Sequence, residues 1–155
     1  SLWFTSLFPR RILFVPSLLN WIYIDYFSEL QKYYWQDSKV TLGMVDKYYD
    51  IGAPKLIGLQ IFNNPNIHAN TGWVGSGYSQ AGYLGILIYS FLIGVILKIL
   101  DTYSKIHDKR VIISLFSIPM LVVLTSSDLL ACFLTHGLLL ALIMIHIIPH
   151  PKIHY

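Results

Sequence analysis

A stretch rich in glycine and small polar residues runs from Asn63 to Gly85, with the sequence NNPNIHANTGWVGSGYSQAGYLG. Five glycines in its second half predict an irregular backbone, because glycine permits positive φ angles and close approach. Such a loop can bring amide groups and polar side chains against a ligand. The equally weighted alternative is a tight turn leading into a helix whose small residues pack against a neighbour. The candidate ligand contacts are Asn70, Thr71, Trp73, Ser76 and Tyr78.

Aromatic residues crowd into the first fifty positions. Tyrosine and tryptophan suit stacking on sugar rings, since each joins an apolar face to a polar edge, and Tyr23 and Tyr26 are the candidates for that role. The same residue types also form belts at membrane interfaces, which composition alone favours. The cluster comprises Trp21, Tyr23, Tyr26, Phe27, Tyr33, Tyr34, Trp35, Tyr48 and Tyr49.

Proton transfer could fall to His68, five residues before Trp73, as the first choice, or to Asp25 as the second. The full set of candidates in the outer segment is Asp25, Glu29, Asp37, Asp46, Asp50 and His68. Imidazole titrates near physiological pH, and a carboxylic acid among apolar neighbours is pushed toward its neutral form. A lone histidine in a polar loop is more often an ordinary surface residue than a catalytic one. Further along, Asp128 is expected to cap the helix that follows it. His136, an ionisable group within a span, is either a functional residue or, as we prefer, a neutral histidine bonded to a neighbouring helix.

Neither a metal nor a cofactor is expected. The histidines and acids lack the spacing of a metal site, and Cys132 is the single cysteine, so neither a disulfide within the chain nor a cysteine-based zinc site can form. There is no P-loop and no dinucleotide-binding glycine fingerprint. The net charge of +3 is small and dispersed, which argues against nucleic-acid binding.

The elements that must position these residues are predicted from hydropathy. The chain has 155 residues, 55% hydrophobic and 12% charged, whereas soluble domains carry about a quarter charged residues. Residues 81–100 and 129–148 each have the length of a transmembrane helix. Residues 111–127 are shorter and contain Pro119, which predicts a kinked span. The expected fold is therefore all-α, a polytopic helical membrane protein with three to four transmembrane helices in a lipid bilayer.

Orientation follows from the positive charges in short connections. Lys105, Lys109 and Arg110 lie within a ten-residue loop that should face the cytoplasm. Residues 28–80 must then form one extracytoplasmic segment, with their lysines diluted and offset by acids.

Residues 12–27 are apolar but interrupted by a proline, an asparagine and an aspartate. If the segment spans the membrane, Arg10 and Arg11 are cytoplasmic anchors. If it is an interfacial helix, residues 1–8 end a preceding helix and both arginines stand on the outer face. Charge counting slightly favours the first alternative.

Three segments resemble, in order, the C-terminal part of bacterial oligosaccharide repeat unit polymerases, the Wzy-type O-antigen and capsule polymerases. They are RRILFVPSLLNWIYIDYFS, HANTGWVGSGYSQAGYLGILIYSFLIG and SSDLLACFLTHGLLL. The resemblance covers about residues 9–142, and ANTGWVGSGYSQAGYLG is its most specific portion. Family members are much longer, and the chain opens at Ser1 without a methionine, so we expect a fragment of a longer protein.

The resemblance implies a metal-independent membrane glycosyltransferase of the GT-C type in the bacterial inner (cytoplasmic) membrane. Its partner would be an undecaprenyl-diphosphate-linked oligosaccharide, polymerised into O-antigen or capsule at the outer face, with a chain-length regulator as a further partner. It also implies that Arg10 and Arg11 hold the leaving diphosphate, because guanidinium groups bind phosphate by paired, charge-assisted hydrogen bonds. That role favours the interfacial alternative for residues 12–27. A transporter or flippase portion that binds lipid-linked glycan, and an O-antigen ligase, remain the alternative functions.

Overall fold

The computed structural model describes residue 7, residues 9–41 and residues 43–148, apart from the side chains of residues 11, 12 and 40. Most of the expected helix end at residues 1–8 lies outside the described residues. Within the described part the chain is all-helical, without a strand. Its elements are a π-helical turn Arg10–Phe14, α2 (Val15–Ser28), a 3-10 turn Lys39–Thr41, α3 (Ala53–Gln60), α4 (Trp73–Tyr103), α5 (Lys109–Thr125), α6 (Leu129–Thr135) and α7 (Leu138–Ile147).

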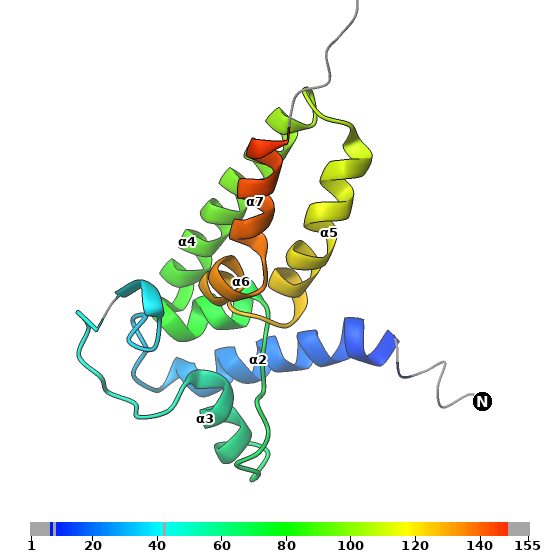
Figure 1. Cartoon of the computed structure of the whole chain (residues 1–155). Coiled ribbons are helices and arrows are strands. Elements are labelled where there is room, and N and C mark those ends of the chain that lie inside the picture. The colour runs from blue at the N-terminus through cyan, green and yellow to red at the C-terminus, as the bar shows by residue number, and fades with distance from the viewer. Residues whose placement is uncertain (1–6, 8, 42, 149–155) are drawn as a thin grey trace, which may run out of the picture.

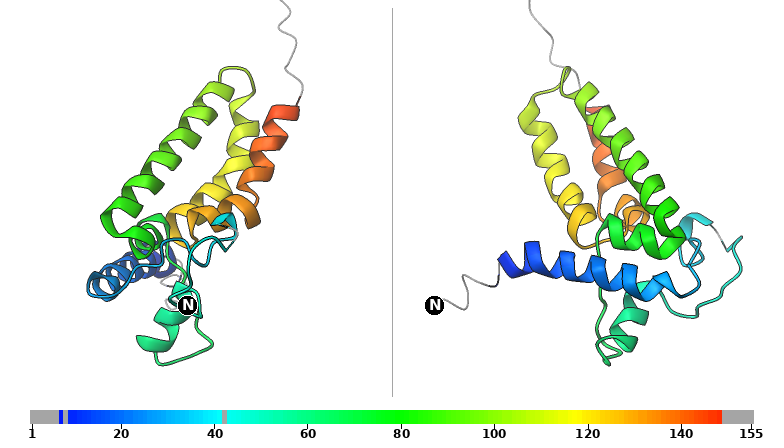
Figure 2. Two further views of the ribbon diagram at one scale, coloured as in Figure 1. Left: turned by 90° about the vertical axis from the view of Figure 1, so that its left-hand side faces the viewer. Right: turned by 180° about the vertical axis from the view of Figure 1, so that it is seen from behind.

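Helices α4, α5 and α7 run along one another as an elongated bundle, and α2 lies crosswise beneath one end of it (Figure 1). Both further views agree on this arrangement (Figure 2). The loop between α4 and α5 is at the opposite end of the bundle, and α3 lies on the far side of α2. The axes of α4, α5 and α7 therefore share one direction, and the axis of α2 crosses it.

The glycine-rich stretch is helical from Trp73 onward, so the predicted irregular loop is wrong for this portion. The helix is interrupted at Ala81 and Gly82, where Gly82 adopts φ +64°. The chain folds back there so closely that a Cβ on Gly85 would lie 2.0 Å from the carbonyl oxygen of Gly77. Gly77 and Gly85 thus permit close backbone approach between the two parts of α4, whereas the packing alternative had placed the small residues against a neighbouring helix.

The C-terminal apolar run forms two helices where one was expected. α6 and α7 are bent by 52° relative to each other, and Gly137 between them has φ +86°, a conformation that glycine adopts without strain. The Asp128 side chain accepts hydrogen bonds from the backbone N–H groups of Leu130 and Ala131. The predicted cap is thus confirmed.

Two hydrophobic cores hold these elements together. The first joins α4 to α5, α6 and α7 through buried residues that include Tyr89, Phe116 and Leu138. The second joins α2 to α3 and to the start of α4 around Phe27 and Ile57. The cores meet near the start of α4, where a cavity lies.

Only part of the transmembrane prediction finds support in helix lengths. Among the described residues, Tyr83–Tyr103 is the one helical segment long and apolar enough to cross a bilayer by length and composition. The bent pair α6 and α7 would be a second if the two form one broken span. α5 contains Pro119, as expected, and is 17 residues long.

Candidate functional site

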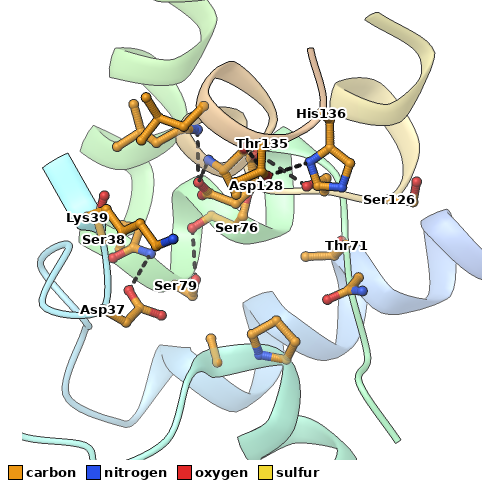
Figure 3. Close-up of a pocket in the computed structure, with 18 of the residues that line it drawn as sticks. Asp37, Ser38, Lys39, Thr71, Ser76, Ser79, Ser126, Asp128, Thr135 and His136 are labelled. Atoms are coloured by element: carbon orange, nitrogen blue, oxygen red, sulfur yellow. Dashed lines mark hydrogen bonds between the residues drawn. The ribbon is translucent and has the colours of Figure 1, made fainter. Parts of the chain in front are cut away.

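A cavity of about 350 Å³ opens where α2, α4, α6 and the segment around Asp37 converge. Figure 3 shows Asp37, Ser38 and Lys39 on one side of it and His136 and Ser126 on the other. Ser76 and Ser79 of α4 and Thr71 add hydroxyl groups to its lining. The site therefore combines many hydroxyls with two carboxylates, one ammonium group and one imidazole.

Side chains of α2 fix the floor of the cavity. The Tyr23 hydroxyl donates to the carbonyl oxygen of Ala69 at 2.9 Å. Burial raises the pKa of Tyr23 above its usual range, so the hydroxyl stays protonated and donates. The Asn20 Oδ1 atom accepts from the Thr71 hydroxyl at 2.7 Å and from the Gly75 N–H at 2.9 Å. These bonds hold the approach to α4 against α2.

The segment that carries Asp37 is attached to α4 through Gln80. Its Oε1 atom accepts from the backbone N–H of Trp35 at 2.7 Å, and its Nε2 atom donates to Asp37 Oδ1 at 3.5 Å. The N–H of Tyr34 donates to the Gln80 carbonyl at 2.8 Å. Tyr34 and Trp35 both have positive φ angles, 47° and 60°, which costs free energy in residues with a Cβ. Their bonds to α4 hold this strained turn beside the cavity.

Asp128 anchors the opposite wall. Its Oδ2 atom accepts from the Tyr89 hydroxyl at 2.7 Å, and the same hydroxyl accepts from the Trp35 indole N–H at 3.0 Å. Burial raises the pKa of the Asp128 carboxyl above its usual range, while the bonds from Tyr89, Ala131 and Leu130 oppose the rise. A chain of hydrogen bonds therefore links the Asp37 segment, α4 and the start of α6.

Thr135 and His136 end α6 at the break before α7. The Thr135 hydroxyl lies 2.6 Å from the carbonyl oxygen of Ala131 and 3.0 Å from His136 Nδ1. The partner described for His136 is thus its own neighbour in sequence, whereas the sequence predicted a bond to another helix. Both side chains are exposed and line the cavity.

The structure brings together four of the residues predicted from sequence. Tyr23, Asn70, Thr71 and Ser76 all line the cavity. Their meeting depends on α2 and α4 packing against each other.

The other predicted site residues do not line this cavity. Arg10, Asp25 and His68 are exposed elsewhere, and Tyr26 is half-buried beside Phe27. Trp73 packs against the first core. Tyr78 is buried in the second core, with its ring edge against Tyr83 and the Lys32 ammonium over its face. Nothing is described for the Arg11 side chain.

Sequence reasoning missed Lys39 and Thr135 as cavity residues, and it named Asp37 only as one of six candidate proton acceptors. Asp128 was predicted only as a helix cap, whereas His136 was weighed both as a functional residue within a span and as a hydrogen-bond partner of another helix, with the second preferred. A signal existed in the motifs SSD and THG, which place polar residues beside apolar helices. The approach of Asp37 depends on the contacts of Trp35 and Gln80, which are 45 residues apart and leave no local pattern.

Among the described residues no group of histidines, cysteines and acids could hold a metal ion. The arrangement can bind a polyhydroxylated ligand, hold one negative charge near Lys39, and accept or release a proton at a carboxylate or an imidazole. Comparisons of the chain with models of known families, with curated proteins and with solved structures found no match.

Proposed function

We propose that this chain belongs to a multi-pass membrane glycosyltransferase that polymerises lipid-diphosphate-linked oligosaccharide repeat units, as its motifs suggest. The observation that carries the proposal is the hydroxyl-rich cavity at one end of an apolar helical bundle. Serine and threonine hydroxyls with carboxylates suit the hydroxyl groups of a glycan. The reaction needs the glycan, one cation for the leaving diphosphate and one proton acceptor, and the lining supplies each type.

A bilayer around the bundle would account for the large apolar side chains exposed on its surface. Leu84, Leu87 and Phe91 on α4 are 61%, 65% and 69% exposed. Apolar area in water is unfavourable by about 25 cal/mol per Å², so a face of this kind needs lipid or another helix. Three spans, formed by α4, α5 and the bent pair α6 and α7, agree with the parallel course of these helices.

The direction of α2 favours the interfacial alternative for residues 12–27. If the bundle axis runs across the bilayer, α2 runs along its surface, because the two directions cross (Figure 1). Its outer side exposes Phe14, Leu18 and Trp21, residue types found on helices that lie in the headgroup region. The cavity then opens at the outer face, since Lys105, Lys109 and Arg110 are at the other end of the bundle.

The diphosphate role is assigned to Lys39, the cation of the cavity lining. Arg10, which the motifs suggested for this role, is about 20 Å along the helix from Tyr23 at 1.5 Å per residue. Arg10 would instead meet lipid headgroups beside the site and guide the carrier lipid toward it. Tyr23, Asn70, Thr71 and Ser76 would contact the glycan.

Chain growth in the polysaccharide-producing bacterium tests the proposal. Replacing Asp37 with Asn and His136 with Gln together should leave single repeat units on the cell surface in place of long chains. A flippase would instead lose all surface units when its site is damaged, and a ligase would leave long chains on the carrier lipid. Normal long chains on the surface would refute the proposal.

A further inference from the structure

His136 occupies a position that neither the helix break nor a buried core requires. It is the last residue before Gly137, it is exposed, and its ring borders the cavity opposite Asp37 and Lys39 (Figure 3). A histidine in the middle of an apolar span is costly unless it serves a function. The hydrogen bonds of its neighbour Thr135 determine which nitrogen of the ring carries the proton.

The Thr135 hydroxyl has a single hydrogen, and two acceptors lie near it. The carbonyl oxygen of Ala131 is 2.6 Å away, a distance at which two oxygens must share a hydrogen. Since a carbonyl cannot donate, the hydroxyl donates to Ala131. The 3.0 Å contact between the Thr135 oxygen and His136 Nδ1 then needs a hydrogen from the ring.

A ring that donates this hydrogen carries its proton on Nδ1 in the neutral form. Which nitrogen of a histidine is protonated follows from the hydrogen bond that the other ring nitrogen makes. With Nδ1–H directed to Thr135, the Nε2 atom has its lone pair available, and it belongs to a ring that borders the cavity. Thr135 thus acts as a positioning residue that prepares a proton acceptor.

We propose that His136 is the general base of the cavity, and that Thr135 fixes its reactive tautomer; this rests on the proposed glycosyl transfer. The hydroxyl of the acceptor sugar attacks the anomeric carbon of the lipid-linked donor. A new carbon–oxygen bond forms as the bond from the anomeric carbon to the phosphate oxygen breaks, and the electron pair leaves with the lipid diphosphate. The hydroxyl proton passes to Nε2, giving an imidazolium that later releases it to water.

The tautomer is measurable without any substrate. The protein is labelled with ¹⁵N-histidine in lipid nanodiscs, and long-range ¹H–¹⁵N correlation spectra are recorded at mildly alkaline pH. The signals that vanish in His136→Gln identify the residue. We expect protonated Nδ1 and unprotonated Nε2; a proton on Nε2 in the wild-type protein would overturn the proposal.

Two substitutions isolate the role of Thr135. Thr135→Val removes the hydroxyl and should shift the ring toward the Nε2–H form, while Thr135→Ser should restore the wild-type spectrum. A merely structural role for Thr135 would leave the tautomer unchanged in Thr135→Val, and that result would refute the positioning.

Surface polysaccharide then reports on catalysis. His136→Gln should lower polymerisation by about 10²–10⁴-fold, the usual contribution of a general base, at unchanged protein level. The matched control is His146→Gln at the other end of the bundle, which should keep long chains. Long chains in His136→Gln with none in Asp37→Asn would refute the base but leave the proposed function standing. Long chains in both variants would contradict the proposed function itself.

Discussion

Individual carboxylates and cations of the cavity differ in how firmly the fold holds them. Asp128 receives three hydrogen bonds, from Tyr89, Leu130 and Ala131, whereas Lys39 is exposed on a short 3-10 turn. A half-buried carboxylate that keeps its bonds is a structural centre whose ionisation costs folding free energy. An exposed ammonium in the cavity lining suits a charged group that arrives and leaves.

Asp128 should make stability depend on pH. Burial raises the pKa of its carboxyl in the folded protein, so the folded state binds more protons than the unfolded chain between the two pKa values. Stability contributed by this group is therefore complete below the unfolded pKa and falls as pH rises through the folded one. Thermal unfolding in detergent, followed from pH 4 upward, should show this fall in wild type and lose it in Asp128→Asn.

Tyr89→Phe should change the pH dependence in the opposite sense to Asp128→Asn, by raising the pKa of Asp128 further. The Tyr89 hydroxyl lowers the pKa of Asp128 through its hydrogen bond, so its removal should extend the fall in stability to higher pH. It should also destabilise the fold by about 1–3 kcal/mol, because Asp128 Oδ2 and the Trp35 indole both lose a partner. A Tyr89→Phe profile identical in shape to wild type would contradict this network.

Substitutions of Lys39 and Arg10 test which of the two cations binds the leaving diphosphate. If Lys39 serves the leaving group, Lys39→Gln should lower polymerisation by about 10²-fold or more, as loss of one stabilising donor does, and Arg10→Gln should have the smaller effect. The length distribution of surface chains measures both. A larger effect of Arg10→Gln than of Lys39→Gln would contradict the role of Lys39 and support diphosphate binding by the arginines.

At the scale of elements, the broken helix α4 and the crosswise helix α2 form the cavity. Residues 73–80 of α4 supply Ser76, Ser79 and Gln80 to the lining only because the chain folds back at Gly82. That fold requires the backbones at Gly77 and Gly85 to touch. A side chain at this point would therefore separate the two halves of α4.

Gly85→Ala should destabilise the fold by about 2–4 kcal/mol, because its Cβ would meet the Gly77 carbonyl at 2.0 Å. Gly94→Ala is the matched control in the same helix. No atom lies within 4 Å of its added Cβ, so it should be neutral or stabilising by up to about 1 kcal/mol through helix propensity. Unfolding in detergent compares them, and equal effects would contradict the close approach.

The depth of α2 in the bilayer is a separate prediction for this element. Spin labels at Leu18 of α2 and Phe91 of α4, both exposed, should differ in their access to oxygen and to a water-soluble relaxation agent. The label at position 18 should lie at headgroup depth and that at position 91 near the bilayer centre. A label at position 18 near the centre would make α2 a spanning helix.

For the whole molecule, hydropathy predicted most of the helical fold, including the helix that begins after Gly82, but neither the short helix before Gly82 nor the break at Gly137. Continuous apolar runs predicted 81–100 and 129–148 as single elements, and residues 111–127 as the helix that became α5. The reversals at Gly82 and Gly137 depend on tertiary contacts, because glycine at a helical spacing is compatible with both a helix and a turn. The cavity was predicted in part, through residues 23, 70, 71 and 76, since local polar composition marks them.

The remaining cavity residues depend on distant partners. Asp37 and Lys39 reach the site through the strained turn at Tyr34 and Trp35, which Gln80 holds. His136 is positioned by the bend between α6 and α7. Neither arrangement has a periodic signature in the sequence, so the acid–base role was predicted for His68, an exposed residue outside the lining.

The side of the membrane on which the cavity opens tests the account most directly. In a Cys132→Ala background, single cysteines are placed at Asn70, exposed at the cavity, and at Lys109, exposed in the cationic loop. An impermeant maleimide applied to intact cells should label position 70 and should label position 109 only after the membrane is permeabilised. Labelling of position 109 from outside, with position 70 protected until permeabilisation, would place the cavity in the cytoplasm and contradict glycan polymerisation at the outer face.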